Sequence, residues 1–156
     1  MINEHVGLAM NKAQVFAAVR EAWTASFGQE PGATISLQDP ENGLVEGAAR
    51  VNYRSRMLMG REETMGAVNY RVTIQATNGQ CHVRVHDLRH TGNRGARGGG
   101  LSIGAIMEGE APLEHYPGMG LGPSRRIHAD VRQAAADRVQ ETMRRFVARL
   151  RLLGGQ

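Results

Sequence analysis

Apolar and polar residues alternate with a period of two on both sides of the dipeptide Asn78-Gly79. Asn-Gly is favoured in two-residue β-hairpin turns, whose central positions need positive φ angles. The spacing predicts a hairpin over 66–88 with Ala76 opposite Cys81. A one-residue slip would expose its buried side chains, at roughly 1.5 to 3 kcal/mol each. One face is therefore predicted to be apolar, and the other carries Arg71, Thr73, Gln75, His82, Arg84 and His86.

The same kind of pattern predicts the other elements. A short strand over Ile2–Leu8 precedes a helix over Asn11–Phe27, with Asn11 as its N-cap and Gly28 as its stop. Two strands follow at Thr34–Gln38 and Leu44–Met57, joined by a turn with Pro, Asn and Gly. A long helix over Ser124–Leu153 closes the chain, with one apolar stripe at Ile127, Val131, Ala135, Val139, Met143, Phe146, Leu150 and Leu153.

Small and large apolar residues indicate where the first helix packs. Trp23, the only tryptophan, lies at the helical spacing of the apolar residues and is predicted to anchor the core. Gly47 and Ala49 share one face of the longer strand, where their small size leaves room for a closely packed helix. Ala76, Ala134 and Ala135 are also small, so space for a ligand between sheet and long helix stays an alternative to close packing.

The segment Gly92–Gly122 breaks the pattern, since ten of its 31 residues are glycine. Connections longer than about 12 to 15 residues are usually functional or disordered. A loosely packed flap and a binding loop both remain open, with Leu101, Ile103, Ile106 and Met107 as the apolar residues it could bury.

Length and composition fit one domain. The 156 residues suffice for a core, and we divide them into 1–91 with the first helix and the sheet, the Gly-rich loop 92–122, and the long helix 123–153. Cys81 is the only cysteine, which excludes an internal disulfide, and its place on the apolar face predicts a buried thiol. The net charge is +4, and Lys12 is the only lysine among 19 basic residues, which argues against chemistry that needs an activated lysine.

The long helix is a candidate for self-association. About 30 residues make about 45 Å of helix, whereas a ten-residue strand spans about 33 Å. An overhanging end would place Phe146, Val147, Leu150 and Leu153 against another subunit. The alternative is that the helix bends or frays at 152–154.

Three segments resemble a bacterial family of unknown function with a TBP-like (TATA-box-binding-protein-like) fold, found mainly in exported and envelope proteins. They are VGLAMNKAQVFAAVREAWTASFG, ISLQDPENGLVEGAARVNY and VNYRVTIQATNGQCHVRVHDLRH. The positions that characterise the family's sequence pattern are occupied here by Trp23, Gly43, Gly47, Tyr70 and Asn78-Gly79. The resemblance covers about 5–91 and, more loosely, the closing helix. It implies an α+β fold of strand, helix, four-stranded antiparallel meander and long C-terminal helix, with the helices on one face of the sheet. It brings no catalytic residue, and it implies a periplasmic or secreted protein.

The N-terminus leaves the localisation open. The residues MINEHVGLAMNK contain neither a basic n-region nor an apolar h-region, and no stretch approaches the roughly 20 apolar residues of a membrane span. Periplasmic or secreted is the expectation if a signal peptide was removed, and cytoplasmic otherwise.

The sequence contains partial motifs for catalysis and metal binding, but they lack the neighbouring elements that such sites need. Gly100-Leu101-Ser102-Ile103-Gly104 matches the nucleophile elbow, but no strand precedes it and no suitable acid and histidine follow. No Gly-Lys-Ser/Thr is present for a P-loop, and no helix opens behind the glycines for a dinucleotide site. His82, His86 and His90 are spaced by four, which on a strand separates successive rings by roughly 13 Å, so solvated histidines are expected. A metal site completed by Glu114 or His115 is a minor alternative.

The polar sheet face is the remaining candidate site. It holds few acids, Glu46 and Asp87 apart, and its candidate anion- or partner-binding residues are Arg50, Arg54, Arg71, His82, Arg84, His86, Arg94 and Arg97. We predict a non-enzymatic binding module with a protein partner or self-association, and without cofactor or metal. The first alternative is an anion or nucleic-acid binder, although stacking aromatics are missing. The second is a helix-grip-like carrier of a small ligand.

Overall fold

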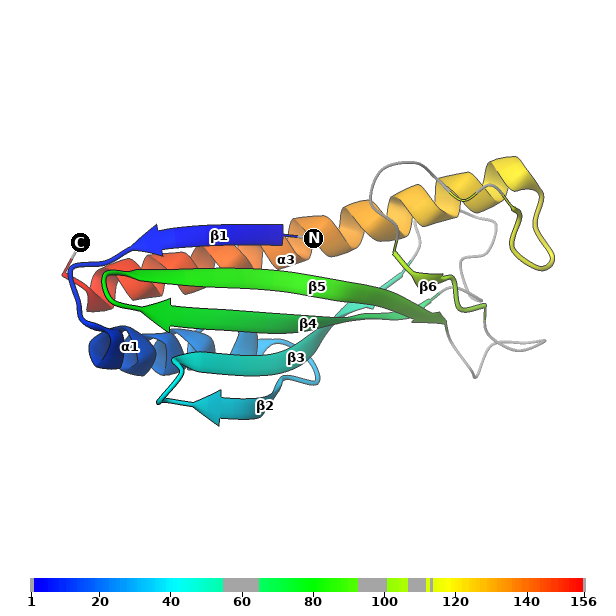
Figure 1. The fold of residues 1–156 in the computed structure, drawn as a ribbon. Helices are drawn as coiled ribbons and strands as arrows, with labels where there is room; N and C mark the ends of the chain where they lie inside the picture. Colours follow the sequence, from blue (N-terminus) through cyan, green and yellow to red (C-terminus); the bar gives the residue numbers. More distant parts are fainter. Residues whose placement is uncertain (1, 55–64, 93–100, 107–111, 113, 156) are drawn as a thin grey trace. The chain divides into compact units, whose positions relative to one another are not determined.

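The structure is a computed structural model that describes all residues except 1, 55–64, 93–100, 107–111, 113 and 156. Its strands form one sheet in the order β1-β5-β4-β3-β2, and a sixth strand, β6, pairs with β5 (Figure 1). This confirms the predicted α+β class with an antiparallel sheet. The elements in chain order are β1 (Ile2–Gly7), α1 (Lys12–Thr24), the 3-10 helix η1 (Phe27–Gln29), β2 (Thr34–Asp39), β3 (Leu44–Tyr53), β4 (Gly66–Thr77), β5 (Gln80–Gly92), β6 (Gly104–Ala105) and α3 (Leu121–Leu153).

The chain forms two compact units, each built from segments far apart in the sequence. The first unit contains 1–50, 70–86 and 139–156, and the second contains 51–69 and 87–138. No helix in the described part of the chain is both long enough and apolar enough to cross a membrane.

The predicted hairpin turn is present in the first unit. β4 ends at Thr77 and β5 starts at Gln80, so Asn78 and Gly79 form the turn. Gly79 has a φ of +80°, whereas the φ of Asn78 is not positive, so only the second central position adopts the left-handed conformation expected for both. The alternating apolar residues on both arms are buried, as predicted: Val72, Ile74, Ala76, Cys81, Val83 and Val85.

Helix α1 begins as predicted and ends earlier than predicted. Asn11 caps it through a capping box, in which its side chain accepts from the Gln14 amide at 3.0 Å. The helix ends at Thr24, and Gly28 lies in η1, so the predicted helix over Asn11–Phe27 with Gly28 as its stop is wrong. Gly28 is a close-approach site, because a Cβ there would lie 2.9 Å from the Trp23 carbonyl oxygen.

Helix α1 packs on the sheet through Trp23, whose exposed fraction is 4%. A Cβ on Gly47 would lie 2.6 Å from Cη2 of Trp23, so the strand needs glycine where the ring crosses it. The predicted close approach is therefore confirmed. Phe27 extends this core, since its ring lies 5.4 Å from Trp23 and 5.7 Å from Phe146 between centroids.

The C-terminal part of α3 is joined to the N-terminal segment of the first unit by polar contacts, one of which pairs Arg145 with Glu30 at 3.7 Å. Thr142 donates to the Glu30 carboxylate at 2.7 Å, and both residues are buried. Arg149 donates to Glu21 at 2.8 Å in an exposed ion pair. Along the whole helix the predicted apolar stripe is buried except for Leu153, which is half-buried.

In the second unit, β5 changes which residues point inward. Asp87 has a φ of +53°. Before Asp87 the buried residues of β5 have odd numbers, and Val85 is the last of them. After Asp87 they have even numbers, and His90 is buried. A single residue with positive φ that reverses the alternation is typical of a β-bulge. The expectation that His90 is a solvated histidine is therefore wrong.

Part of the Gly-rich segment is ordered against this end of β5. Gly104 pairs with His90 in the β5–β6 ladder, and Ile103 is buried, as the sequence suggested it could be. The Ile103 amide donates to Nδ1 of His90 at 3.1 Å. Met107 lies outside the described residues, as do the residues of the predicted strand beyond Arg54.

Candidate functional site on the open sheet face

The sheet of the first unit has one buried face and one face, called here the open face, that carries polar side chains. Among the predicted site residues, the structure brings five together on it, with the arginines exposed and the histidines half-buried: Arg50, Arg71, His82, Arg84 and His86. Thr73 and Gln75 share this face, and Thr73 Oγ1 lies 2.9 Å from Nε2 of His86.

Strand β1 adds two residues that the sequence analysis did not include. β1 pairs with β5, and the register places Asn3 opposite Arg84 and His5 opposite His82. The alternation of His5 with Val6 in the sequence indicated a strand with one polar and one apolar face. It carried no information about which strand β1 would join, because backbone pairing is the same for any sequence.

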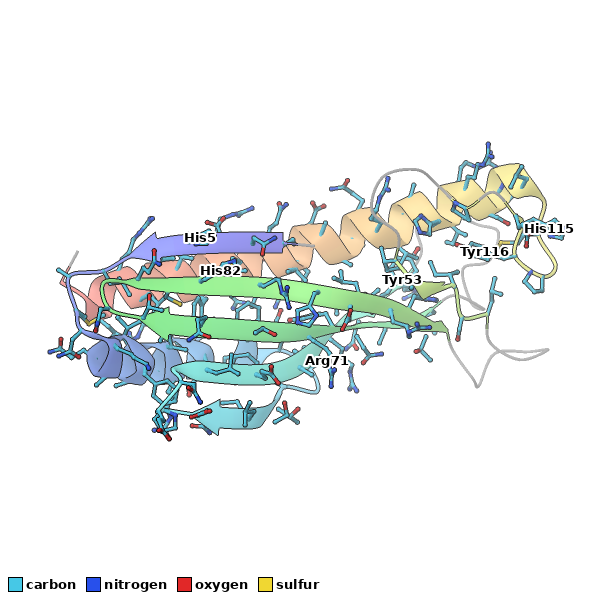
Figure 2. The ribbon with its side chains drawn as sticks, viewed as in Figure 1. His5, Tyr53, Arg71, His82, His115 and Tyr116 are labelled. Carbon is cyan, nitrogen blue, oxygen red and sulfur yellow. The ribbon has the colours of Figure 1, made fainter. Side chains whose placement is uncertain are left out.

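His5 and His82 form a stacked pair, with ring centroids 4.0 Å apart and planes 5° from parallel (Figure 2). His82 Nε2 also lies 3.3 Å from Oδ1 of Asn3. The pKa of His82 is lowered, mainly by desolvation and further by the nearby His5 and Arg84. Near neutral pH this imidazole is therefore uncharged, and an anion bound beside it would favour its protonation.

The arginines give the open face its charge. Arg71 (Figure 2) and Arg84 are exposed on neighbouring strands. Arg50 lies on β3, with its side chain beside Gly32. Guanidinium groups stay protonated at any physiological pH and present a planar fork of donors that fits carboxylates. This part of the surface is therefore suited to an anionic partner.

The structure does not assign the other three residues of the predicted set to this face. Arg54 is exposed in the second unit, and Arg94 and Arg97 lie outside the described residues.

The predicted oligomer contact on the long helix is wrong for two of its four residues. Phe146 and Leu150 are 0% exposed, because they pack into the core of their own chain. Val147 and Leu153 are half-buried. The physical reason at Phe146 is that Phe27, in the 3-10 helix η1, packs against its ring at 5.7 Å between centroids.

Two residues considered for catalysis and metal binding have structural contacts. Ser102 Oγ accepts from the Gly92 amide at 2.9 Å, so it fastens the loop to β5. His115 is exposed, with Nδ1 3.1 Å from the Tyr116 carbonyl oxygen (Figure 2). Among the described residues, no three or more His, Cys, Asp or Glu side chains gather in a way that could hold a metal ion.

The second unit contains a buried polar cluster that the sequence analysis missed. The Tyr53 hydroxyl donates to Asp130, and the Tyr53 ring meets His90 edge-on at 5.7 Å. Because Nδ1 of His90 accepts from an amide, the neutral ring carries its proton on Nε2. On α3 of the same unit, His128 is also buried, and desolvation, with the nearby Arg132, lowers its pKa. The sequence analysis missed this cluster because His90 turns inward only through the bulge at Asp87, and no glycine marks that bulge in the sequence.

Comparison with known proteins identifies the fold. No protein-family model matches the chain, and no curated protein matches it. The chain is similar to the crystal structure of a DUF4468 family protein from Bacteroides ovatus ATCC 8483, at 17% identity and a TM-score of 0.59, over 93% of this chain and 84% of that one. It is also similar to a TBP-like protein from Parabacteroides distasonis ATCC 8503, at 7% identity and a TM-score of 0.53, over 93% and 90% of the two chains. At these identities the likeness concerns the fold alone, and it confirms that the chain has the TBP-like fold that the sequence resemblance implied.

Proposed function

We propose that this chain is a non-enzymatic binding module whose open face binds an acidic protein partner. The observation that carries the proposal is the group of exposed arginines and half-buried histidines on one face of the sheet. Arg50, Arg71 and Arg84 provide permanent positive charge there. Charge complementarity of this kind steers a partner and fixes its register.

An acidic protein is favoured over nucleic acid by the positions of the aromatic residues. Sheet-based binders of single strands stack bases on exposed aromatic rings. Here the tryptophan, the phenylalanines and two tyrosines are buried, and the half-buried Tyr116 is in the second unit. Carboxylates need only the charge and the donors that the open face has.

The test uses the charge-reversed variant Arg71→Glu with Arg84→Glu and measures binding to poly-L-glutamate over a series of salt concentrations. We expect the unaltered chain to bind, with affinity falling as salt shortens the Debye length from about 10 Å at 0.1 M to about 3 Å at 1 M. Each reversal changes a contact worth about 1 kcal/mol in water into a repulsion of similar size, so the double variant should lose at least about tenfold in affinity.

The matched control is Arg20→Glu with Arg126→Glu, which changes the net charge equally at exposed positions outside the open face. Equal loss in both double variants would show that net charge, rather than this face, attracts the ligand. Absence of salt-dependent binding would reject the proposal. Single-stranded DNA bound more tightly than poly-L-glutamate, with the same dependence on Arg71 and Arg84, would favour the nucleic-acid alternative.

A further inference from the structure

A second surface of the first unit lies away from the open face, between the edge strand β1 and the C-terminal part of α3. It is a groove of about 610 Å³. Volumes of about 300 to 1,000 Å³ are typical of sites for small molecules. The residues that the argument uses are Ile2 and Glu4 from β1, and Met143, Arg144, Val147, Ala148 and Arg151 from α3.

The apolar lining of the groove comes from helical and strand spacing. Met143 and Val147 are four residues apart on α3, so they lie on one side of the helix, and Ala148 follows directly. Ile2 stands opposite Val85 on β5, whose side chain is buried on the helix-bearing face of the sheet. The groove therefore has apolar residues on both of its walls, beside the polar side chains of Asn3, Glu4 and Gln140.

Positive charge dominates the rim of the groove. Arg144 and Arg151 are both exposed and lie seven residues apart on α3, which corresponds to about 10.5 Å along the axis. Within the described part of the chain neither makes an ion pair, and Glu4 is the acid that lines the groove beside them. A second copy of this groove would bring the same excess of positive charge, which disfavours pairing of two copies here.

An apolar lining below two arginines fits a ligand with an apolar body and an anionic end. We propose that this groove binds a small amphipathic anion, with a hydrocarbon body against Ile2, Val147 and Ala148 and a carboxylate or sulfonate at Arg144 and Arg151. Arginine's fork of donors can hold either head group with paired hydrogen bonds.

The experiment measures fluorescence on titration with 1-anilinonaphthalene-8-sulfonate, followed by displacement with dodecanoate and, separately, with uncharged dodecanol. We expect the probe to bind and dodecanoate to displace it more effectively than dodecanol. Arg144→Glu with Arg151→Glu should weaken probe binding at least about tenfold, because two attractive contacts become repulsive. Ala148→Trp should also weaken it, since the indole would fill the groove without changing the charge.

Two control variants locate the site and keep it separate from the open face. Arg20→Glu on α1 and Arg84→Glu on the open face each change one exposed charge outside the groove and should leave probe binding within about twofold. Circular dichroism should show the same melting temperature for the arginine variants, because these side chains are exposed. Lack of binding by the unaltered chain, equal binding by the Arg144/Arg151 variant, or loss of binding in Arg84→Glu would each overturn the proposal.

Discussion

The buried contact between Glu30 and Thr142 should contribute more to stability than the exposed ion pair between Glu21 and Arg149. Both contacts join α3 to the N-terminal segment of the first unit. Their surroundings differ, because the Glu30 side chain is 2% exposed and the Glu21 side chain is 54% exposed. Thr142→Val removes the hydroxyl donor while keeping the shape of the side chain.

The expected magnitudes follow from this difference in exposure. A hydrogen bond to a buried charged group is worth about 1.5 to 3 kcal/mol, and its loss leaves a carboxylate oxygen that water cannot reach. An exposed ion pair contributes about 0 to 1 kcal/mol, because water screens both charges. In a chain of this length 1 kcal/mol shifts the melting temperature by about 2 to 4 °C, so Thr142→Val should lower it by about 3 to 12 °C and Glu21→Gln by at most about 4 °C.

Urea unfolding followed by circular dichroism measures both free energies of unfolding. Repeating Thr142→Val in a Glu30→Gln background tests the cause, since the substitution should cost less when no carboxylate needs the donor. The reasoning is refuted if Thr142→Val costs no more than Glu21→Gln, or if its cost is the same in both backgrounds.

Three other predictions concern the core and its titratable groups. Gly47→Ala should destabilise the fold by about 1 to 3 kcal/mol in urea unfolding, because its Cβ would lie 2.6 Å from the Trp23 ring; an unchanged midpoint would contradict this packing. Burial raises the pKa of Cys81 to about 12, so iodoacetamide at pH 8 should label it only when the chain unfolds, and rapid labelling of the folded chain would show an exposed thiol. The pKa values of His82 and His128 are lowered from 6.5, so the unfolded chain binds more protons than the folded chain below that pH. The melting temperature should therefore fall as the pH drops below 6.5, and His128→Gln should reduce this dependence.

Much of the fold could be predicted because its signals are local. The hairpin needs only Asn78-Gly79 and the alternation on either side, and α3 needs only its apolar stripe. The end of α1 could not be read in this way. Phe27 continues the helical spacing, but its ring packs against Phe146, more than a hundred residues away, and the chain leaves the helix to reach it.

The candidate site was predicted in part. Arg71, His82, Arg84 and His86 follow from the hairpin register, which alternation specifies strongly. His90 did not follow, because one residue with positive φ at Asp87 reverses the alternation and nothing in the local pattern marks it. Burial of Phe146 could not be seen either, since an apolar residue at a helix end suits a partner and a core equally.

By itself, the sequence determined which residues alternate, where the hairpin turns and which side of the long helix is apolar, because these properties depend on neighbours within a few positions. Only the tertiary structure decided that β1 joins β5 and brings His5 onto His82, and that a groove remains between β1 and α3. Strand pairing uses backbone groups that every residue shares, so the choice of partner depends on how the whole core packs. Both proposed sites depend on that choice, since β1 supplies His5 to the open face and one wall of the groove.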